Sequence, residues 1–285
     1  MATSNNFLPH GIIAFLKDKT NFNFTKMIID AHTHVGFDGV IPDASVERLV
    51  AALRKADTDK ALVFAGRING CPTERLVEAL KPHQGMLYPV GSVSPLEAEK
   101  PNLKTVEVWL RDGLIHGLKF YSGYEYFHPF DEVLRPYLHL LAKYGKPAIF
   151  HSGDTYSKAD KAKLKYALPI HVDDLATEMP ELKIVIAHMG YPWVTDAAEV
   201  CYKNANVYSD CSGFVYGKFD APQRRHFIEL FKEFMRVVRT PDKLLYGSDW
   251  PVAEPSSYVP VVKALAGKNA RKIFSENAMR VYGIE

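Results

Sequence analysis

The segment Ile28-Ile29-Asp30-Ala31-His32-Thr33-His34 joins a short apolar run to two histidines separated by one residue. Side chains of a β-strand alternate between its two faces, so Asp30, His32 and His34 are expected on the same face. Two imidazoles one strand step apart can bind a common zinc ion at about 2.0–2.1 Å. An H-x-H pair can also be an ordinary pair of core or surface histidines. The apolar strand before it and the adjacent Asp30 favour a metal ligand pair.

Seven further short apolar segments follow along the chain. Gly, Pro, Asp or Asn bounds each of them, as is typical of strands. With the first segment, the predicted strands are 27–31, 60–65, 86–93, 114–120, 147–151, 183–188, 206–209 and 243–247.

Helical patterns separate these strands. The clearest is 44–56, where Val46, Leu49, Val50 and Leu53 recur at helical spacing. The full set of predicted helices is 44–56, 72–80, 102–111, 131–144, 173–178, 193–203, 222–238, 256–266 and 269–282. Strands that alternate with helices imply parallel pairing through right-handed crossovers. Eight such units predict an α/β fold, a (β/α)8 TIM barrel; periodicity alone leaves a doubly wound open sheet as the alternative.

Composition sets the broad class of the protein. The 285 residues carry a formal net charge of +2 and no basic run, so neither a nucleic acid nor a membrane is the expected partner. Cys71, Cys201 and Cys211 form no C-x-x-C pair, which favours a reducing, cytoplasmic location. No apolar run approaches the roughly 18 residues that span a bilayer.

The chain is interpreted as one domain with a short extension. Residues 1–26 are polar and lack periodicity, so we expect an N-terminal extension there. Residues 27–285 contain the alternating pattern and are expected to form a single barrel domain of a size usual for this fold. The sequence leaves open whether the protein is a monomer or a homo-oligomer.

Three further ionisable residues stand where predicted strands end. His151 and His188 close the fifth and sixth strands, and Asp249 follows the eighth. The carboxyl ends of barrel strands gather at one mouth, where catalytic residues of such barrels lie. A lone histidine at such a place is usually structural. Together with His32 and His34, however, these side chains indicate a metal-centred active site.

Six local motifs carry a resemblance to a known family. They are Asp30-Ala31-His32-Thr33-His34, Gly117-Leu118-Lys119, His151-Ser152-Gly153-Asp154, Ala187-His188-Met189-Gly190, Tyr246-Gly247-Ser248-Asp249-Trp250-Pro251 and Glu276-Asn277-Ala278-Met279-Arg280-Val281-Tyr282. In this order the sequence resembles the amidohydrolase superfamily from about residue 27 to its end. It is most similar to the amidohydrolase-related branch, which contains predicted TIM-barrel metal-dependent hydrolases and the aminocarboxymuconate-semialdehyde decarboxylase group.

The resemblance implies one divalent metal ion held at the mouth. Its ligands would be His32, His34, His151 and Asp249. Three imidazoles and a carboxylate suit Zn²⁺ best, with Mn²⁺, Fe²⁺, Co²⁺ and Ni²⁺ as alternatives. His188 would be a second catalytic residue beside Asp249. In two-metal members a lysine at the position of Lys119 is carbamylated and bridges the ions, so a second metal stays open; a substrate-facing lysine is the alternative.

The expected substrate is a small molecule. Arg67 directly follows the second strand, where it could clamp a carboxylate or be a solvated loop residue. Tyr121 and Trp250 follow predicted strands and, with Lys119, are expected to contact the substrate.

The predicted reaction is hydrolysis of a small amide, lactone or ester by metal-activated water, with Asp249 as proton acceptor. The alternative is metal-dependent, non-oxidative decarboxylation of a small unsaturated or aromatic acid, which needs the same ligands. A metal-binding protein without turnover is a third hypothesis. The presence of both Asp249 and His188 argues against it, because metal storage needs no acid–base pair.

Overall fold

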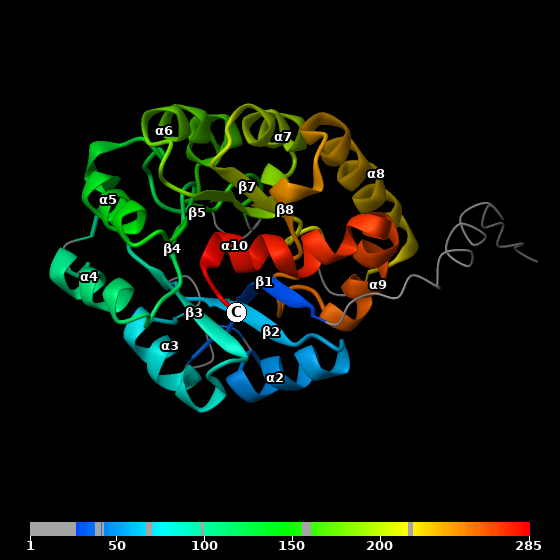
Figure 1. The fold of residues 1–285 in the computed structure, drawn as a ribbon, viewed down its shortest axis with the longest axis horizontal. Helices are drawn as coiled ribbons and strands as arrows, with labels where there is room; N and C mark the ends of the chain where they lie inside the picture. Colours follow the sequence, from blue (N-terminus) through cyan, green and yellow to red (C-terminus); the bar gives the residue numbers. More distant parts are fainter. Residues whose placement is uncertain are drawn as a thin grey trace, which may run out of the picture.

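The computed structural model describes residues 27–285 apart from 38–40, 42, 67–69, 98–99, 156–160 and 216–218. Its centre is a parallel sheet of eight strands in the order β1 to β8, ringed by helices (Figure 1). The strands are β1 (Ile29–His34), β2 (Lys60–Phe64), β3 (Leu87–Ser92), β4 (Leu118–Phe120), β5 (Ala148–Phe150), β6 (Ile184–Ile186), β7 (Val207–Asp210) and β8 (Leu244–Leu245). The predicted TIM barrel is therefore confirmed.

The first and last strands close the ring. Ala31 N donates to Tyr246 O at 2.8 Å, and His34 N donates to Trp250 O at 2.7 Å. A parallel bridge between Thr33 and Trp250 extends the contact beyond the end of β8. These bonds place the segment that contains Asp249 directly beside the two histidines of β1.

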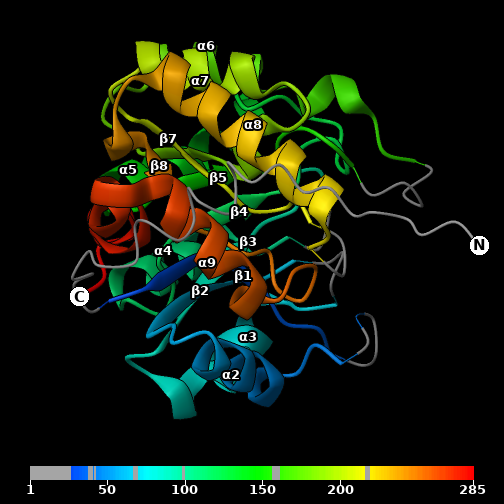
Figure 2. The ribbon, with the colours of Figure 1, turned by 90° about the vertical axis from the view of Figure 1, so that its right-hand side faces the viewer.

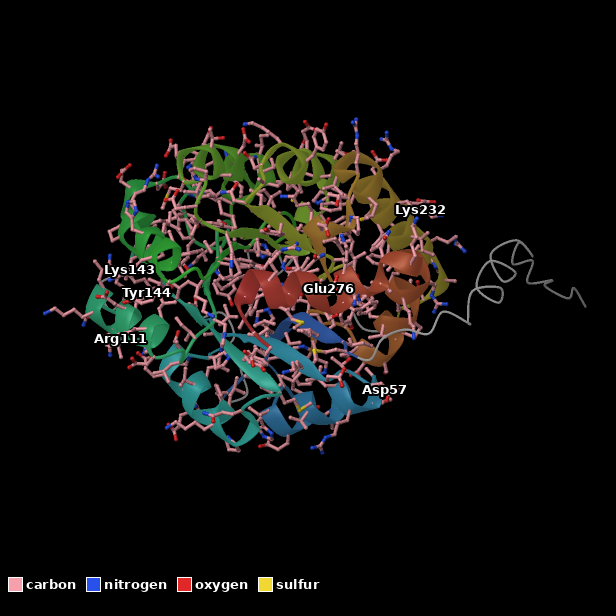
Figure 3. The ribbon with its side chains drawn as sticks, in the orientation of Figure 1. Asp57, Arg111, Lys143, Tyr144, Lys232 and Glu276 are labelled. Atoms are coloured by element: carbon pink, nitrogen blue, oxygen red, sulfur yellow. The ribbon has the colours of Figure 1, made fainter. Side chains whose placement is uncertain are left out.

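Helices cover the outside of the sheet on all sides in the two ribbon views (Figures 1 and 2). They are α2 (Val46–Lys55), α3 (Thr73–Leu80), α4 (Leu103–Arg111), α5 (Arg135–Lys143), α6 (Val172–Glu178), α7 (Val194–Lys203), α8 (Ala221–Val238), α9 (Pro255–Ala266) and α10 (Asn277–Tyr282). Exposed side chains such as Arg111, Lys143 and Lys232 extend from the outer surface (Figure 3). None of the helices in the described part of the chain is long and apolar enough to cross a bilayer.

Several element boundaries differ from the sequence prediction, and two of the differences have a clear local cause. The predicted strand 114–120 begins only at Leu118, because Leu114 N and Ile115 N donate back to Trp109 O and extend the turn after α4. The predicted helix 269–282 is interrupted by a π-helical turn at Lys272–Glu276, and α10 starts after it.

The amino end of the barrel interior is apolar and closed. Leu62, Val90 and Val185 lie in one buried cluster with Val281 and Tyr282 of α10. Helix α10 crosses the end of the ring in Figure 1. Lysines next to the strands hold it there: Lys146 Nζ donates to Tyr282 O at 2.8 Å, and Lys183 Nζ donates to Arg280 O at 3.0 Å. The carboxyl ends of the strands are therefore the open mouth.

Candidate active site

Three of the predicted metal ligands converge where β1 meets the segment after β8. Asp249 Oδ1 lies 3.2 Å from His34 Nε2 and 3.7 Å from His32 Nε2. One ligand atom from each of the three residues lies within 4.8 Å of the other two, so the three side chains could hold a single ion. The His32 side chain is fully buried, whereas His34 and Asp249 are each 13% exposed. The cluster therefore has a closed inner side and an open outer side.

The backbone holds this cluster in place. Asp249 N donates to His32 O at 2.8 Å, and Asp249 adopts a left-handed conformation with φ of 62°. Aspartate tolerates that region better than most residues. Gly247 allows the close approach of the two segments, because a Cβ there would lie 2.9 Å from His32 Cβ. Small local features of the motif thus decide how near the carboxylate stands to the imidazoles.

A buried carboxylate that the sequence analysis missed orients His32. Asp210, at the end of β7, lies with its Oδ2 2.9 Å from His32 Nδ1, and both side chains are buried. A carboxylate accepts hydrogen bonds, so Nδ1 carries the proton and Nε2 keeps its lone pair. His32 Nε2 has no hydrogen-bond partner in the described part of the chain. A buried acceptor without a partner costs free energy, and a metal ion there would satisfy it.

Asp210 stands at the end of a strand, as the predicted site residues do. The predicted seventh strand stops at residue 209, but β7 includes Asp210. An acidic residue at a strand end was the signal, and ending the strand one residue early hid it.

His188 lies beside this pair. Its ring centroid is 4.7 Å from that of His32, and its Nδ1 is 2.8 Å from Ser212 Oγ. The backbone after β6 turns sharply here, with left-handed φ values at His188 and Met189. Asp210 Oδ1 accepts from His188 N at 3.1 Å and so anchors the turn. The structure thus places the predicted second catalytic histidine next to the candidate ligands.

His151 stands slightly apart. Its side chain is largely buried, with its ring centroid 5.1 Å from that of His188. Its Nε2 donates to Asp154 O at 2.9 Å, which leaves Nδ1 as the nitrogen with a lone pair. Its nitrogens are not part of the compact set that His32, His34 and Asp249 form. Its role as a fourth ligand stays a prediction.

A second compact set joins His32, His188 and Asp210. We favour the set with Asp249, because both oxygens of Asp210 already accept hydrogen bonds within the chain. Metal ligands also have to present lone pairs. The buried imidazoles meet that need: burial is the main cause that lowers the pKa of His151 to about 3, and burial also holds the pKa of His32 and His188 well below the usual range.

Lys119 lies inside the barrel on β4. It is 1% exposed, and its Nζ has no hydrogen-bond partner among the residues that the structure describes. The Nζ atom is 5.4 Å from the ring centroid of Phe64 and 5.5 Å from that of Tyr121. Burial lowers its pKa to about 8, so the amine is still mostly protonated at neutral pH. Lys119 is therefore a buried cation near the imidazoles, and the described residues offer it no ion-pair partner.

The other residues predicted to contact the substrate are Tyr121, Trp250 and Arg67. Tyr121 is buried, and its hydroxyl donates to Ala65 O at 2.7 Å. Trp250 is 3% exposed and packs in an apolar cluster that also contains Val35 and Ala44. Arg67 lies outside the described residues, as does the predicted extension 1–26. Contact of Tyr121, Trp250 and Arg67 with a substrate stays a prediction.

A cavity of about 290 Å³ opens beyond the ends of β2 and β3. Its lining includes Gly66, Thr73, Ser92, Ser94 and Glu97. None of the candidate metal ligands lines it. Its place at the carboxyl ends of neighbouring strands puts it on the same side of the barrel as the candidate site.

Comparison with known proteins agrees with this architecture. An uncharacterized TIM-barrel protein from Bordetella bronchiseptica is 20% identical, with a TM-score of 0.68 over 90% of this chain and 99% of that one. An amidohydrolase from Burkholderia multivorans with bound zinc is 15% identical, with a TM-score of 0.63 over 91% and 100% of the two chains. A 5-carboxyvanillate decarboxylase from Novosphingobium aromaticivorans with bound manganese is 13% identical, with a TM-score of 0.66 over 91% and 97%.

At these identities the likeness bears on the fold alone. A comparison with curated proteins gave no match. The family model described as amidohydrolase matches residues 29–284, which is nearly the whole barrel. The chain therefore belongs to the amidohydrolase family.

Proposed function

We propose that this protein is a metal-dependent hydrolase that cleaves a small amide, lactone or ester. The observation that carries the proposal is the convergence of one ligand atom each from His32, His34 and Asp249 within 4.8 Å at the barrel mouth. His32 Nε2 is buried with a lone pair and no partner in the described chain, as expected of a ligand atom. The family's hydrolases and decarboxylases share this barrel, so the choice of reaction belongs to the proposal.

The donor set fits one divalent ion, most simply Zn²⁺. Neutral imidazoles and a carboxylate are suitable zinc ligands, and Mn²⁺, Fe²⁺, Co²⁺ and Ni²⁺ bind the same atoms. His32, His34 and Asp249 would hold it, with His151 as the fourth ligand. When bound, such an ion acidifies a water molecule toward a pKa of about 7 and polarises a carbonyl group. Zinc in one similar barrel and manganese in another are compatible with this choice.

Asp249 is the proposed proton acceptor. Its carboxylate is partly exposed at the mouth, where it can reach a water molecule as well as the imidazoles. It would take the proton of the attacking water and return it to the leaving group. His188 keeps an unprotonated Nε2 if Ser212 accepts from its Nδ1, so it is suited to accept a proton rather than to donate one.

The proposed substrate carries a negative charge. The buried ammonium of Lys119 lacks an ion-pair partner in the described structure and would attract a carboxylate of the substrate. Arg67, by its place in the sequence after β2, would be a second contact for that group. We propose no nucleic acid or membrane partner.

The test separates three outcomes. The zinc-loaded chain is incubated with lactones, esters and amides that bear a carboxylate, and with unsaturated and aromatic acids; released acid, amine and CO₂ are measured. Release of acid or amine, lost after chelation and in Asp249→Asn, supports the hydrolase. Metal-dependent CO₂ release would replace it with a decarboxylase. Stoichiometric zinc without turnover across the panel would contradict both enzymatic assignments.

A further inference from the structure

We propose that Asp210 is a positioning residue that sets the tautomers of His32 and His188 from a single carboxylate. In this arrangement both imidazoles carry their proton on Nδ1 and present an Nε2 lone pair to the site. The inference rests on the proposed function only in the use to which those lone pairs are put.

Both carboxylate oxygens of Asp210 accept hydrogen bonds from the chain. Its Oδ2 accepts from His32 Nδ1 at 2.9 Å. Its Oδ1 accepts from the backbone N of His188 and of Ser212, each at 3.1 Å, and from the Ser212 hydroxyl. The chain therefore already engages both oxygens of the carboxylate, which suits an orienting group better than a metal ligand.

The direction of the hydrogen bonds from His188 through Ser212 to Asp210 follows from which groups carry a proton. An ionised carboxylate can only accept, so the single hydroxyl proton of Ser212 points at Asp210 Oδ1. Ser212 Oγ is then left with lone pairs toward His188 Nδ1, 2.8 Å away. His188 Nδ1 must donate, and its Nε2 carries no proton. The chain Asp210–Ser212–His188 thus repeats, through one hydroxyl, what Asp210 does directly to His32.

Burial strengthens the hydrogen bonds that set the two tautomers. Asp210, Ser212 and His32 have no exposed surface, so no solvent competes for their donors and acceptors. Hydrogen bonds in such surroundings are electrostatically stronger than in water, and an unpaired partner is costly. A carboxylate behind a ligand imidazole also raises its basicity, and loss of such a partner typically lowers metal affinity 10–100-fold.

The substitution Asp210→Asn tests the direct hydrogen bond between Asp210 and His32. The Asn carbonyl would keep the backbone donors, which places its NH₂ group against His32 Nδ1. Two donors cannot face each other, so His32 should switch to the Nε2–H tautomer and lose its ligand lone pair. We expect zinc affinity of the full chain, measured by chelator competition, to fall 10–100-fold. Ser209→Ala is the control: it removes a neighbouring buried hydroxyl whose bond goes to Ile186 O, and zinc affinity should stay within twofold.

The substitution Ser212→Ala tests the link from Asp210 to His188 through the Ser212 hydroxyl. Nitrogen NMR of the ¹⁵N-histidine-labelled full chain should show Nδ1–H on His32 and His188 in the wild type. In Ser212→Ala, His188 should lose the Nδ1–H signature while His32 keeps it. Wild-type zinc affinity in Asp210→Asn would overturn the proposal. An Nε2–H tautomer on His32 in the wild type would also overturn it, and that measurement does not depend on how well a variant folds. Both measurements omit substrate, so a chain that meets them but hydrolyses nothing contradicts only the proposed function.

Discussion

Asp249 Oδ1 lies 3.2 Å from His34 Nε2, at the seam where the last strand of the barrel returns to the first. The two residues are 215 positions apart in a chain whose ring closes through hydrogen bonds such as Asp249 N to His32 O. The hydrogen bonds that close the barrel therefore also bring the site residues together. A variant that keeps the seam but changes the charge separates the chemistry from the fold.

Asp249→Asn is that variant. Asparagine has nearly the same shape and tolerates the left-handed φ of 62°, so the melting temperature should be close to that of the wild type. The amide cannot accept a proton from water, so turnover should fall by about 10²–10⁴-fold, the usual contribution of a general base. The checks are initial rates on the best substrate and a thermal melt. Near-normal turnover would remove Asp249 from its proposed role.

His32→Ala addresses the metal. It removes the buried imidazole whose Nε2 has no partner in the described residues, so zinc content after dialysis should drop well below one per chain. His139→Ala on α5 is the matched control, because that histidine is exposed on the outer surface. Elemental analysis of both variants beside the wild type gives the answer. A full complement of zinc in His32→Ala would show that His32 is no ligand.

Lys119→Met addresses the buried cation. Burial lowers the pKa of Lys119 in the folded chain to about 8 from its usual 10.5, so the unfolded chain binds more protons between those pH values. Stability should therefore rise with pH across that window in the wild type, and this part should be missing in the variant. From pH 8 to 10 we expect the wild type to gain about 2 kcal/mol more than Lys119→Met, measured by denaturant unfolding with chelator present.

The same variant separates two roles for the lysine. Below pH 8 the buried charge costs stability, so Lys119→Met should be the more stable protein there. Parallel pH profiles for the two proteins would instead mean that the amine has a counter-charge in the folded state. Carbamylation would supply one, and an added mass of the intact chain would reveal it.

The strands were predictable because each is a short apolar run between turn residues. Their buried side chains pack inside the barrel or against the surrounding helices. The chain direction then fixed which ends form the mouth. The exact ends were less accessible: the turn after α4 delays β4 to Leu118 through bonds to Trp109 O, which depend on how the helix stops. β1, by contrast, runs on through His34, so the whole H-x-H pair is held by the sheet.

The site could be outlined from strand ends but not completed. His32 and His34 are neighbours in sequence, whereas the contact of His32 with Asp210 spans 178 positions and has no local pattern. The spacing of aromatic residues after strands does not say how deeply each side chain is buried. Trp250 follows a strand, and tertiary packing buries it in a cluster that also contains Val35 and Ala44, while its contact with a substrate stays a prediction. Side-chain direction after a strand depends on which loop covers it, and spacing does not encode that.

Gly213→Ala probes how closely the chain is packed around His188. Gly213 has a φ of 78°, and a Cβ there would lie 2.5 Å from His188 Nδ1, so the imidazole has to move. Gly145→Ala is the control, with a φ of 63° and no atom of the described residues within 4 Å of the added Cβ. Both should lose about 1–2 kcal/mol of stability from the left-handed backbone. Only Gly213→Ala should also lose turnover, by tenfold or more, because it displaces the His188 ring from Ser212 Oγ. Equal turnover in the two variants, measured at a temperature where both are folded, would mean that the position of His188 does not matter for the reaction.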